Sequence, residues 1–298
     1  MTRTLRASLA AFALLLAVAA SAFAQDRAQE VLAQARSAMG SKGELTAVTS
    51  LAVGASVRRV VQAVGMELNS DVQLEFLLPD KYRRTENISI GAITRTISMG
   101  LNGADLLYDD GGAAGMTGMD PKAPGPVHDQ IVKSLKEDVF RMVLVLLLAP
   151  PSNLACTLTS GGVAEAPDGK ADVVDVKGPD KLNLRLFFDS TSHRLLLATY
   201  ETESIDAEQM KALTQKAMEK AKADPANAAK VGQEMRDEME KAPKKMITVQ
   251  MHFSDPKAFG AVTLPSKMSV EGGPQGTEEW TFSSLKLNPP LKPERFAK

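Results

Sequence analysis

The sequence predicts an α+β protein in which a curved antiparallel sheet wraps one or two helices. Three observations carry this prediction. Long stretches of the chain alternate apolar and polar residues with a period of two, which is typical of strands with one buried face. Short turns rich in glycine, proline and aspartate separate these stretches, so that consecutive strands form antiparallel pairs. Few segments have the spacing of a core-facing helix, and a sheet with so little helical cover must curve to bury its apolar face.

The chain begins with features that predict a removable signal peptide over residues 1–24. Arg3 and Arg6 form a basic start, an apolar run follows, and residues 22–24 supply a small-x-small cleavage site. No cysteine follows the run, so a lipid anchor at the cleavage point is not expected. The sequence therefore predicts a periplasmic protein in which residues 25–298 form one domain.

Charge and cysteine content limit the partners and the stabilising devices. Cleavage would remove two arginines and no acid, and the remaining 33 basic residues against 36 acidic ones leave a net charge of −3. This balance gives no basic surface for nucleic acid, so we expect no nucleic-acid partner. Cys156 is the only cysteine, which excludes an intramolecular disulfide. The apolar run 142–149 is far below the roughly 20 residues that span a bilayer, so no membrane-spanning segment is expected.

The first half of the mature chain predicts a helix, a set of strands and a second helix. Apolar residues recur at helical spacing over residues 28–39. Residues 46–110 then alternate with a period of two and predict half-buried strands, although Arg95 interrupts one apolar row. After a loop rich in glycine and proline, residues 127–148 predict a second helix whose apolar stripe faces the core.

The second half returns to strands and contains one insertion. Turn signals at residues 166–170 and 189–192 separate strand-like runs, and the stretch 253–268 supplies a further turn and strand. Residues 205–241 interrupt this pattern with a charged segment rich in alanine and methionine. Asp224-Pro225 divides the segment, and proline suits the first position of a helix that the preceding aspartate caps.

The inserted segment 205–241 is therefore predicted to be a helical hairpin with a narrow apolar stripe. Two interpretations stay open. In the first, the stripe packs on itself or on the sheet and the charged faces are solvated. In the second, the hairpin is a lid or an arm that docks on a protein partner, a use to which methionine-rich surfaces are suited.

Motifs for catalysis or metal binding do not assemble from this sequence. His128, His193 and His252 are far apart and lie in no metal-binding spacing. A Ser-x-x-Lys match at residues 283–286 lies inside a predicted strand and lacks the companion motifs of penicillin-binding enzymes. We therefore expect no enzymatic activity, no metal and no cofactor.

Several strand-and-turn motifs occur in an order that resembles a known family. They are PDKYRR at 79–84, GLNG at 100–103, DVVDV at 172–176, LRLFFDSTSHRL at 184–195, FSDPKAFGAVTLPSKM at 253–268 and EWTFSSLKLNPPLKPERF at 279–296. Preceded by a signal peptide and a short helix, this order resembles the outer-membrane lipoprotein-sorting proteins, the LolA/LolB-like periplasmic carriers. The resemblance implies an unclosed half-barrel whose concave apolar face, partly covered by helices, holds acyl chains. The inserted segment 205–241 and the greater length depart from the compact carriers.

Two functions are compatible with this reading. In the first, the protein binds lipid or lipoprotein acyl chains, at about 0.8 kcal/mol per buried methylene, and would carry them towards the outer membrane. The candidate lining residues are Val72, Leu74, Phe76, Met99, Leu101, Leu184, Leu186, Phe188, Val249, Met251, Trp280 and Phe282. The same residues could instead fill a ligand-free core against the second helix. The alternative function is an envelope regulatory or scaffolding protein that binds a protein partner through the half-barrel and Ile205 to Lys241.

Overall fold

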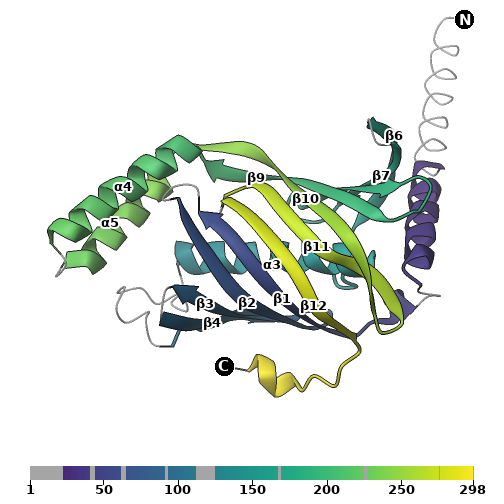
Figure 1. Ribbon diagram of the computed structural model, residues 1–298, viewed down its shortest axis with the longest axis horizontal. Coiled ribbons are helices and arrows are strands. Elements are labelled where there is room, and N and C mark those ends of the chain that lie inside the picture. Colours follow the sequence, from purple (N-terminus) through teal and green to yellow (C-terminus); the bar gives the residue numbers. More distant parts are fainter. Residues whose placement is uncertain are drawn as a thin grey trace, which may run out of the picture.

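A computed structural model describes residues 23–40, 44–61, 65–90, 93–111, 125–166, 169–224, 227–274 and 276–297 (Figure 1). These residues form twelve strands in one antiparallel sheet, which curves strongly and does not close. The strands are β1 (Ser50–Val61), β2 (Met66–Leu77), β3 (Lys81–Ile90), β4 (Ile93–Asn102), β5 (Asp105–Asp109), β6 (Thr157–Ala166), β7 (Gly169–Lys177), β8 (Asn183–Asp189), β9 (Leu195–Ile205), β10 (Lys244–Phe259), β11 (Val262–Gly273) and β12 (Gly276–Leu287). The predicted α+β half-barrel is confirmed.

The first and last strands along the chain, β1 and β12, are neighbours in the middle of the sheet. The strand order is β5-β4-β3-β2-β1-β12-β11-β10-β9-β8-β7-β6, so β1 to β5 form one meander and β6 to β12 another. The two meanders join where β1 pairs with β12, with Leu51 opposite Leu287 and Arg59 opposite Glu278. β5 and β6 are left as the edges, and the chain between them contains the main core helix.

Helix α3 (Pro126–Leu147) covers the concave face of the sheet (Figure 1). Every residue from Phe140 to Leu148 is buried, and all of these side chains except that of Arg141 join the inward-facing strand residues in one core cluster. Leu148 ends the helix in a left-handed conformation, with a φ of 52°, while its N–H donates to the Leu144 carbonyl. The prediction of a core-facing helix over residues 127–148 is confirmed, including its deeply buried end.

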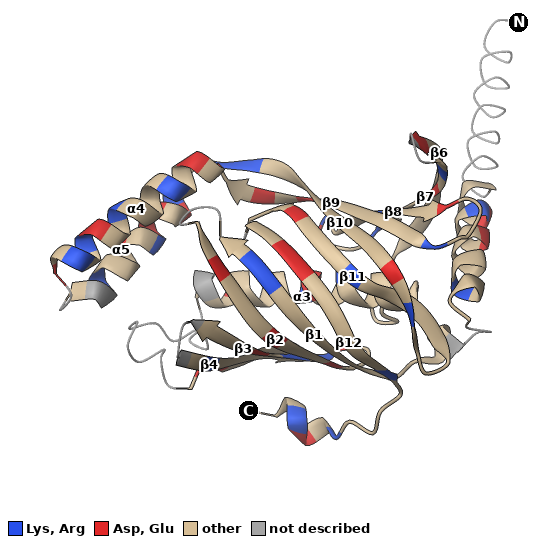
Figure 2. Ribbon diagram, in the orientation of Figure 1, with Lys and Arg blue, Asp and Glu red and all other residues tan. Residues whose placement is uncertain are grey.

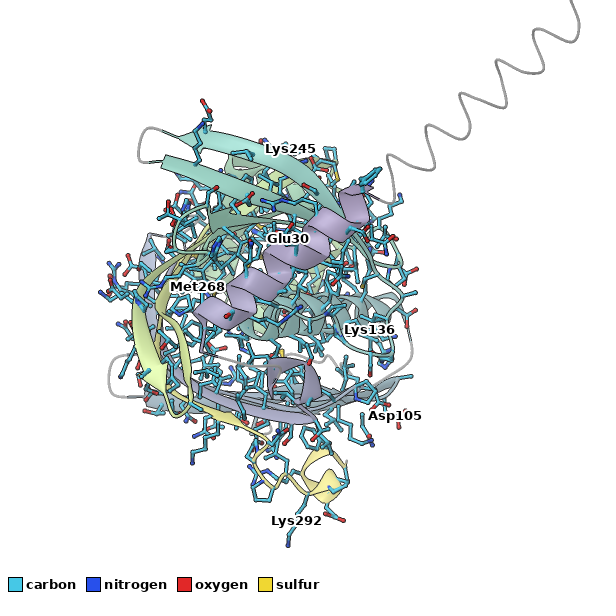
Figure 3. The ribbon with its side chains drawn as sticks, turned by 90° about the vertical axis from the view of Figure 1, so that its right-hand side faces the viewer. Glu30, Asp105, Lys136, Lys245, Met268 and Lys292 are labelled. Carbon is cyan, nitrogen blue, oxygen red and sulfur yellow. The ribbon has the colours of Figure 1, made fainter. Side chains whose placement is uncertain are left out.

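The N-terminal helix, described over residues 23–38, lies across one end of the half-barrel (Figure 3). Its buried stripe of Ala28, Val31, Leu32 and Ala35 belongs to the core cluster. Arg36 donates from Nη1 to the carbonyl of Leu148 at 2.7 Å and so ties the helix to the end of α3. The predicted signal peptide lies outside the described residues except for its last two positions.

The inserted segment forms the predicted hairpin of α4 (Ala207–Ala223) and α5 (Ala228–Lys241), which extends beyond the strands (Figure 1). The two helices pack against each other, and two ion pairs, Lys216–Glu238 at 2.7 Å and Lys220–Glu234 at 2.8 Å, connect them. Acidic and basic residues are interspersed along both helices (Figure 2).

The predicted cap of the second hairpin helix is wrong. Asp224 is the C-terminal cap of α4, since its N–H donates to the Lys220 carbonyl, and Asn227 is the residue that precedes α5. The physical reason is that a residue before proline disfavours helical geometry, so Asp224 ends the helix that precedes it. Pro225 lies outside the described residues.

Candidate functional site

A cavity of about 170 Å³ lies between α3 and the concave face of the sheet. Its apolar wall consists of Leu74, Met142, Met251, Met268, Val270 and Trp280. Its polar wall consists of Tyr82, Arg84, Ser134, Glu137, Asp138, Arg141, Tyr200, Thr202 and Glu278. A site with two such walls suits an amphiphile better than a purely apolar molecule.

Three of the twelve candidate lining residues border this cavity, namely Leu74, Met251 and Trp280. The other nine do not. Eight of them are buried in the interior, with exposures between 0% and 4%: Val72, Phe76, Leu101, Leu184, Leu186, Phe188, Val249 and Phe282. The ninth, Met99, is half-buried and packs against the core cluster. Most of the candidate residues on the concave face are thus packed in the protein interior, and only three of them border the cavity.

Four charged residues from three strands form what we call the charge cluster: Arg59, Arg84, Glu86 and Glu278. Arg84 donates to Glu86 at 2.8 Å, Arg59 lies 3.5 Å from Glu86, and Arg59 Nε donates to Glu278 at 2.8 Å. Their side chains are only 11% to 18% exposed. Charges buried to this degree need close partners, and each member of the cluster has one.

Sequence reasoning missed the charge cluster, although a signal was present. Arg84 lies opposite Leu74 and Glu86 opposite Val72, so both occupy the face that is otherwise apolar. A charged residue in an apolar row of a strand is unusual and marks a buried pair or a site. Arg84 is the last residue of the motif at residues 79–84, which supports the resemblance as a strand-and-turn pattern and not through the charge of Arg84.

The electrostatics of the charge cluster favour the ionised forms of Glu86 and Arg84. Burial alone would raise the pKa of Glu86, but Arg84, the Ser70 hydroxyl and Arg59 outweigh it and hold this pKa below its usual value. Burial would likewise lower the pKa of Arg84, while neighbouring Tyr82 and Glu86 raise it. Ser70 Oγ donates to Glu86 at 2.8 Å and completes the shell of this carboxylate.

Two arginines in the cavity wall stack on aromatic rings. The guanidinium of Arg84 lies 5.4 Å from the centroid of Trp280, and that of Arg141 lies 3.9 Å from the centroid of Tyr200. These contacts hold the guanidinium planes in place and stabilise the positive charge. Burial raises the pKa of Tyr200 to about 12, so its hydroxyl is neutral at physiological pH. The cavity thus combines fixed cations with neutral aromatic surface.

Asp138 lies in the cavity wall at a position that opposes the ionisation of its carboxyl. Burial raises the pKa of its carboxyl, and Arg141 and Arg84 offset this only in part. Its side chain lines the cavity and is 45% exposed. Arg141 donates to Glu137 at 2.7 Å and to Asp138 at 3.4 Å.

The three histidines lie on separate elements, as their spacing in the sequence indicates. His128 is in the first turn of α3, His193 is in the turn between β8 and β9, and His252 is exposed on β10. Within the described residues, no group of three or more histidine, cysteine, aspartate or glutamate side chains could hold a metal ion. Of the helices described, none has the length and hydropathy that crossing a membrane requires.

The fold and the cavity together define a protein of the curved half-barrel class, in which helices cover the concave face. No protein-family model and no curated protein matches the sequence. Among solved structures, the chain is similar to a LolA superfamily protein from Nitrosomonas europaea, with 12% identity, a TM-score of 0.52, and coverage of 91% of this chain and 97% of that chain. The protein therefore has a LolA-like fold, as the resemblance in its sequence implied.

Two further solved structures match at lower scores. One is an outer membrane lipoprotein-sorting protein domain from Vibrio parahaemolyticus, with 11% identity, a TM-score of 0.43 and coverage of 91% and 97% of the two chains. The other is a DUF1329 family protein from Desulfovibrio piger, with 8% identity, a TM-score of 0.44 and coverage of 92% and 97%.

Proposed function

We propose that this protein is a periplasmic binding protein that holds lipid or lipoprotein acyl chains between the concave sheet and α3, for carriage towards the outer membrane. The observation that carries the proposal is the cavity of about 170 Å³, which has an apolar wall and lies beside the helix that covers the concave face. The LolA-like fold agrees with it, because the resemblance of the sequence to the lipoprotein-sorting carriers implies a concave face that holds acyl chains. The proposal includes a signal peptide over residues 1–24.

The size of the cavity sets a condition on binding. A cavity of about 150 Å³ holds one benzene ring, so about 170 Å³ holds only the first part of a chain the length of a myristoyl group. Full entry requires α3 and the cavity side chains to move apart. Met142, Met251 and Met268 suit this because methionine side chains change shape at low cost.

Native mass spectrometry of protein purified from a bacterial periplasm without detergent, followed by lipid extraction, tests the proposal. Near-stoichiometric bound lipid or lipoprotein is the expected result, on a chain that begins at Gln25. A clean apo mass that also fails to take up added lipid would contradict it.

Filling the cavity should block uptake. Met268 borders the cavity and is 2% exposed, and Met268→Trp adds a bulky ring to that wall. We expect lipid uptake to fall at least about tenfold, with a small loss of stability from overpacking, about 1–3 kcal/mol. The matched control is Val163→Trp on the edge strand β6, where the side chain is 57% exposed and uptake should not change. Normal uptake by a folded Met268→Trp protein would argue against this cavity.

A second candidate function places a protein partner on the α4–α5 hairpin. The observation that favours it is that the hairpin packs on itself and extends beyond the strands, as an arm would (Figure 1). Ile205 and Lys244 are paired across β9 and β10, so residues 206–243 can be replaced by a two-residue Asn-Gly turn.

The shortened protein is expected to keep the thermal midpoint of the wild type within about 3 °C, because the hairpin contributes little to the core. Under the second candidate function, crosslinks to a periplasmic partner disappear while lipid uptake is unchanged. Retention of every partner crosslink would exclude this role for the hairpin.

A further inference from the structure

We propose that the cavity selects amphiphiles with an anionic oxygen group, a phosphate or a carboxylate, which binds between Arg84 and Arg141 while the chain follows the apolar wall. The inference rests on the proposed function and deepens it by naming the ligand class. It separates such amphiphiles from neutral diacylglycerol lipids, which carry no charge near the start of their chains.

Unused donors on the two arginines are the first observation. A guanidinium has five N–H donors in a planar fork that matches phosphate and carboxylate oxygens. In the described structure, Arg84 makes one side-chain hydrogen bond, to Glu86, and Arg141 makes two, to Glu137 and Asp138. Arg141 is 8% exposed, and its Nε has no hydrogen-bond partner among the described residues. Both guanidinium groups therefore have donors to offer to a ligand.

Placement of the arginines is the second observation. Arg84 comes from β3 on the sheet side of the cavity and Arg141 from α3 on the helix side. Both residues line the same cavity of about 170 Å³, and Asp138 lies in its wall with them. An anionic group at this point would be reached from two sides, and stacking on Trp280 and Tyr200 holds the guanidinium planes ready.

Most of the acids in the wall are already engaged. Glu278 accepts from Arg59 and from the indole N–H of Trp280, both at 2.8 Å, and Glu137 accepts from Arg141. Asp138 accepts from Arg141 at the longer distance of 3.4 Å, and it would oppose an incoming anion when ionised.

Asp138 also gives the site a pH dependence with a defined sign. The charged groups that face it are Arg84 from β3, Arg141 and Glu137 from α3, and Glu278 from β12. Because burial raises the pKa of Asp138, this carboxyl takes up a proton at a less acidic pH than usual. Protonation removes the repulsion of an anionic ligand, so affinity for anionic amphiphiles should rise as the pH falls towards that pKa.

The chain of the ligand would follow the apolar wall. Trp280 and Leu74 lie on the sheet, and Met142, Met251 and Met268 continue the apolar surface. A neutral diacylglycerol group placed along this wall would bring no anionic acceptor to the arginine donors. Desolvating those donors without a partner costs affinity, which is the physical basis of the selection.

The test compares four probes on the full mature chain: palmitate, phosphatidylglycerol, diacylglycerol and inorganic phosphate. Affinities are measured by native mass spectrometry and by displacement of a fluorescent fatty acid. We expect palmitate and phosphatidylglycerol to bind at least about tenfold more tightly than diacylglycerol. Arg141→Gln and Arg84→Gln should each remove most of this preference.

Two further variants keep the test decisive if an arginine variant fails to fold. Asp138→Asn should tighten binding of the anionic amphiphiles several-fold at neutral pH and flatten its pH dependence. Arg185→Gln is the matched control, because Arg185 is 54% exposed and pairs with Asp175 away from the cavity. Arg185→Gln also removes one positive charge, but it should leave the affinities for all four probes unchanged.

The outcomes separate the inference from the proposed function. Equal affinity for phosphatidylglycerol and diacylglycerol, unaffected by the arginine and Asp138 variants, overturns the inference and leaves acyl-chain binding intact. Displacement by inorganic phosphate as effective as that by phosphatidylglycerol also overturns it, because the site would then take a free anion. Binding of none of the four probes overturns both.

Discussion

Replacing Phe76 with alanine is expected to lower the free energy of unfolding by about 3–5 kcal/mol, the usual range for a large aromatic side chain in a packed core. Phe76 is 0% exposed and lies 4.9 Å from Tyr82 between ring centroids. The loss combines the transfer free energy of the ring with the cost of the void it leaves. Urea unfolding followed by circular dichroism measures it.

This prediction also separates the two readings of the candidate lining residues. If Phe76 bordered open space, Phe76→Ala would lower the free energy of unfolding far less, because residues that line a cavity can shift more easily than residues in a packed core. Leu196→Ala on the outer side of β9 is the control, since Leu196 is 43% exposed and its loss should cost under about 0.5 kcal/mol. A change below about 1 kcal/mol for Phe76→Ala would place this residue at a cavity wall.

Replacing Glu86 with glutamine should cost about 2–3 kcal/mol at neutral pH. Breaking a buried ion pair by removing one partner typically costs about 3–5 kcal/mol. We expect a smaller loss of stability here, because Arg59 would still have Glu278 as its ion-pair partner. Glu86 is the only ion-pair partner of Arg84 among the described residues, so its buried charge would lose that partner. Urea unfolding at pH 7 measures the effect.

The pH dependence of this variant follows from the pKa of Glu86. That pKa is lower in the folded protein than its ordinary value of 4.5, so the ionised carboxylate contributes stability that is fully present above about pH 4.5. The contribution is lost as the pH falls through the folded-state pKa, where the wild type becomes protonated too. The difference between wild type and Glu86→Gln should therefore shrink in acid. Glu67→Gln, at an exposed pair with Arg58, is the control and should show a much smaller difference, because solvent screens an exposed ion pair.

The elements of the fold could be read from the sequence because their patterns are local. A period of two buries one side of a strand whatever its neighbours are, and the stripe of α3 identifies a core-facing helix in the same way. The hairpin at residues 205–241 was recognisable from its charge and its alanine content. Its cap was misplaced because Asp224 can serve either the end of one helix or the start of the next, and the neighbouring geometry decides between them.

The site was less accessible to sequence reasoning. Leu74, Met251 and Trp280 border the cavity, but the same alternation also selects residues such as Leu186 and Phe188, which are packed in the core. Alternation reports which face of a strand is buried. It carries no information on whether the space opposite that face is filled by α3 or left open.

The sequence by itself determined the strands, the helices, the absence of a disulfide and the one-sided apolar faces, because each depends on residues close together in the chain or on composition. The tertiary structure alone decided the strand order and the pairing of β1 with β12, which brings Arg59 to Glu278 across 219 residues. It also decided that Arg84 and Arg141 border one cavity. The physical reason is that strand partners and register depend on hydrogen bonds and packing between residues far apart in the sequence. These interactions form only when the whole sheet curves around α3.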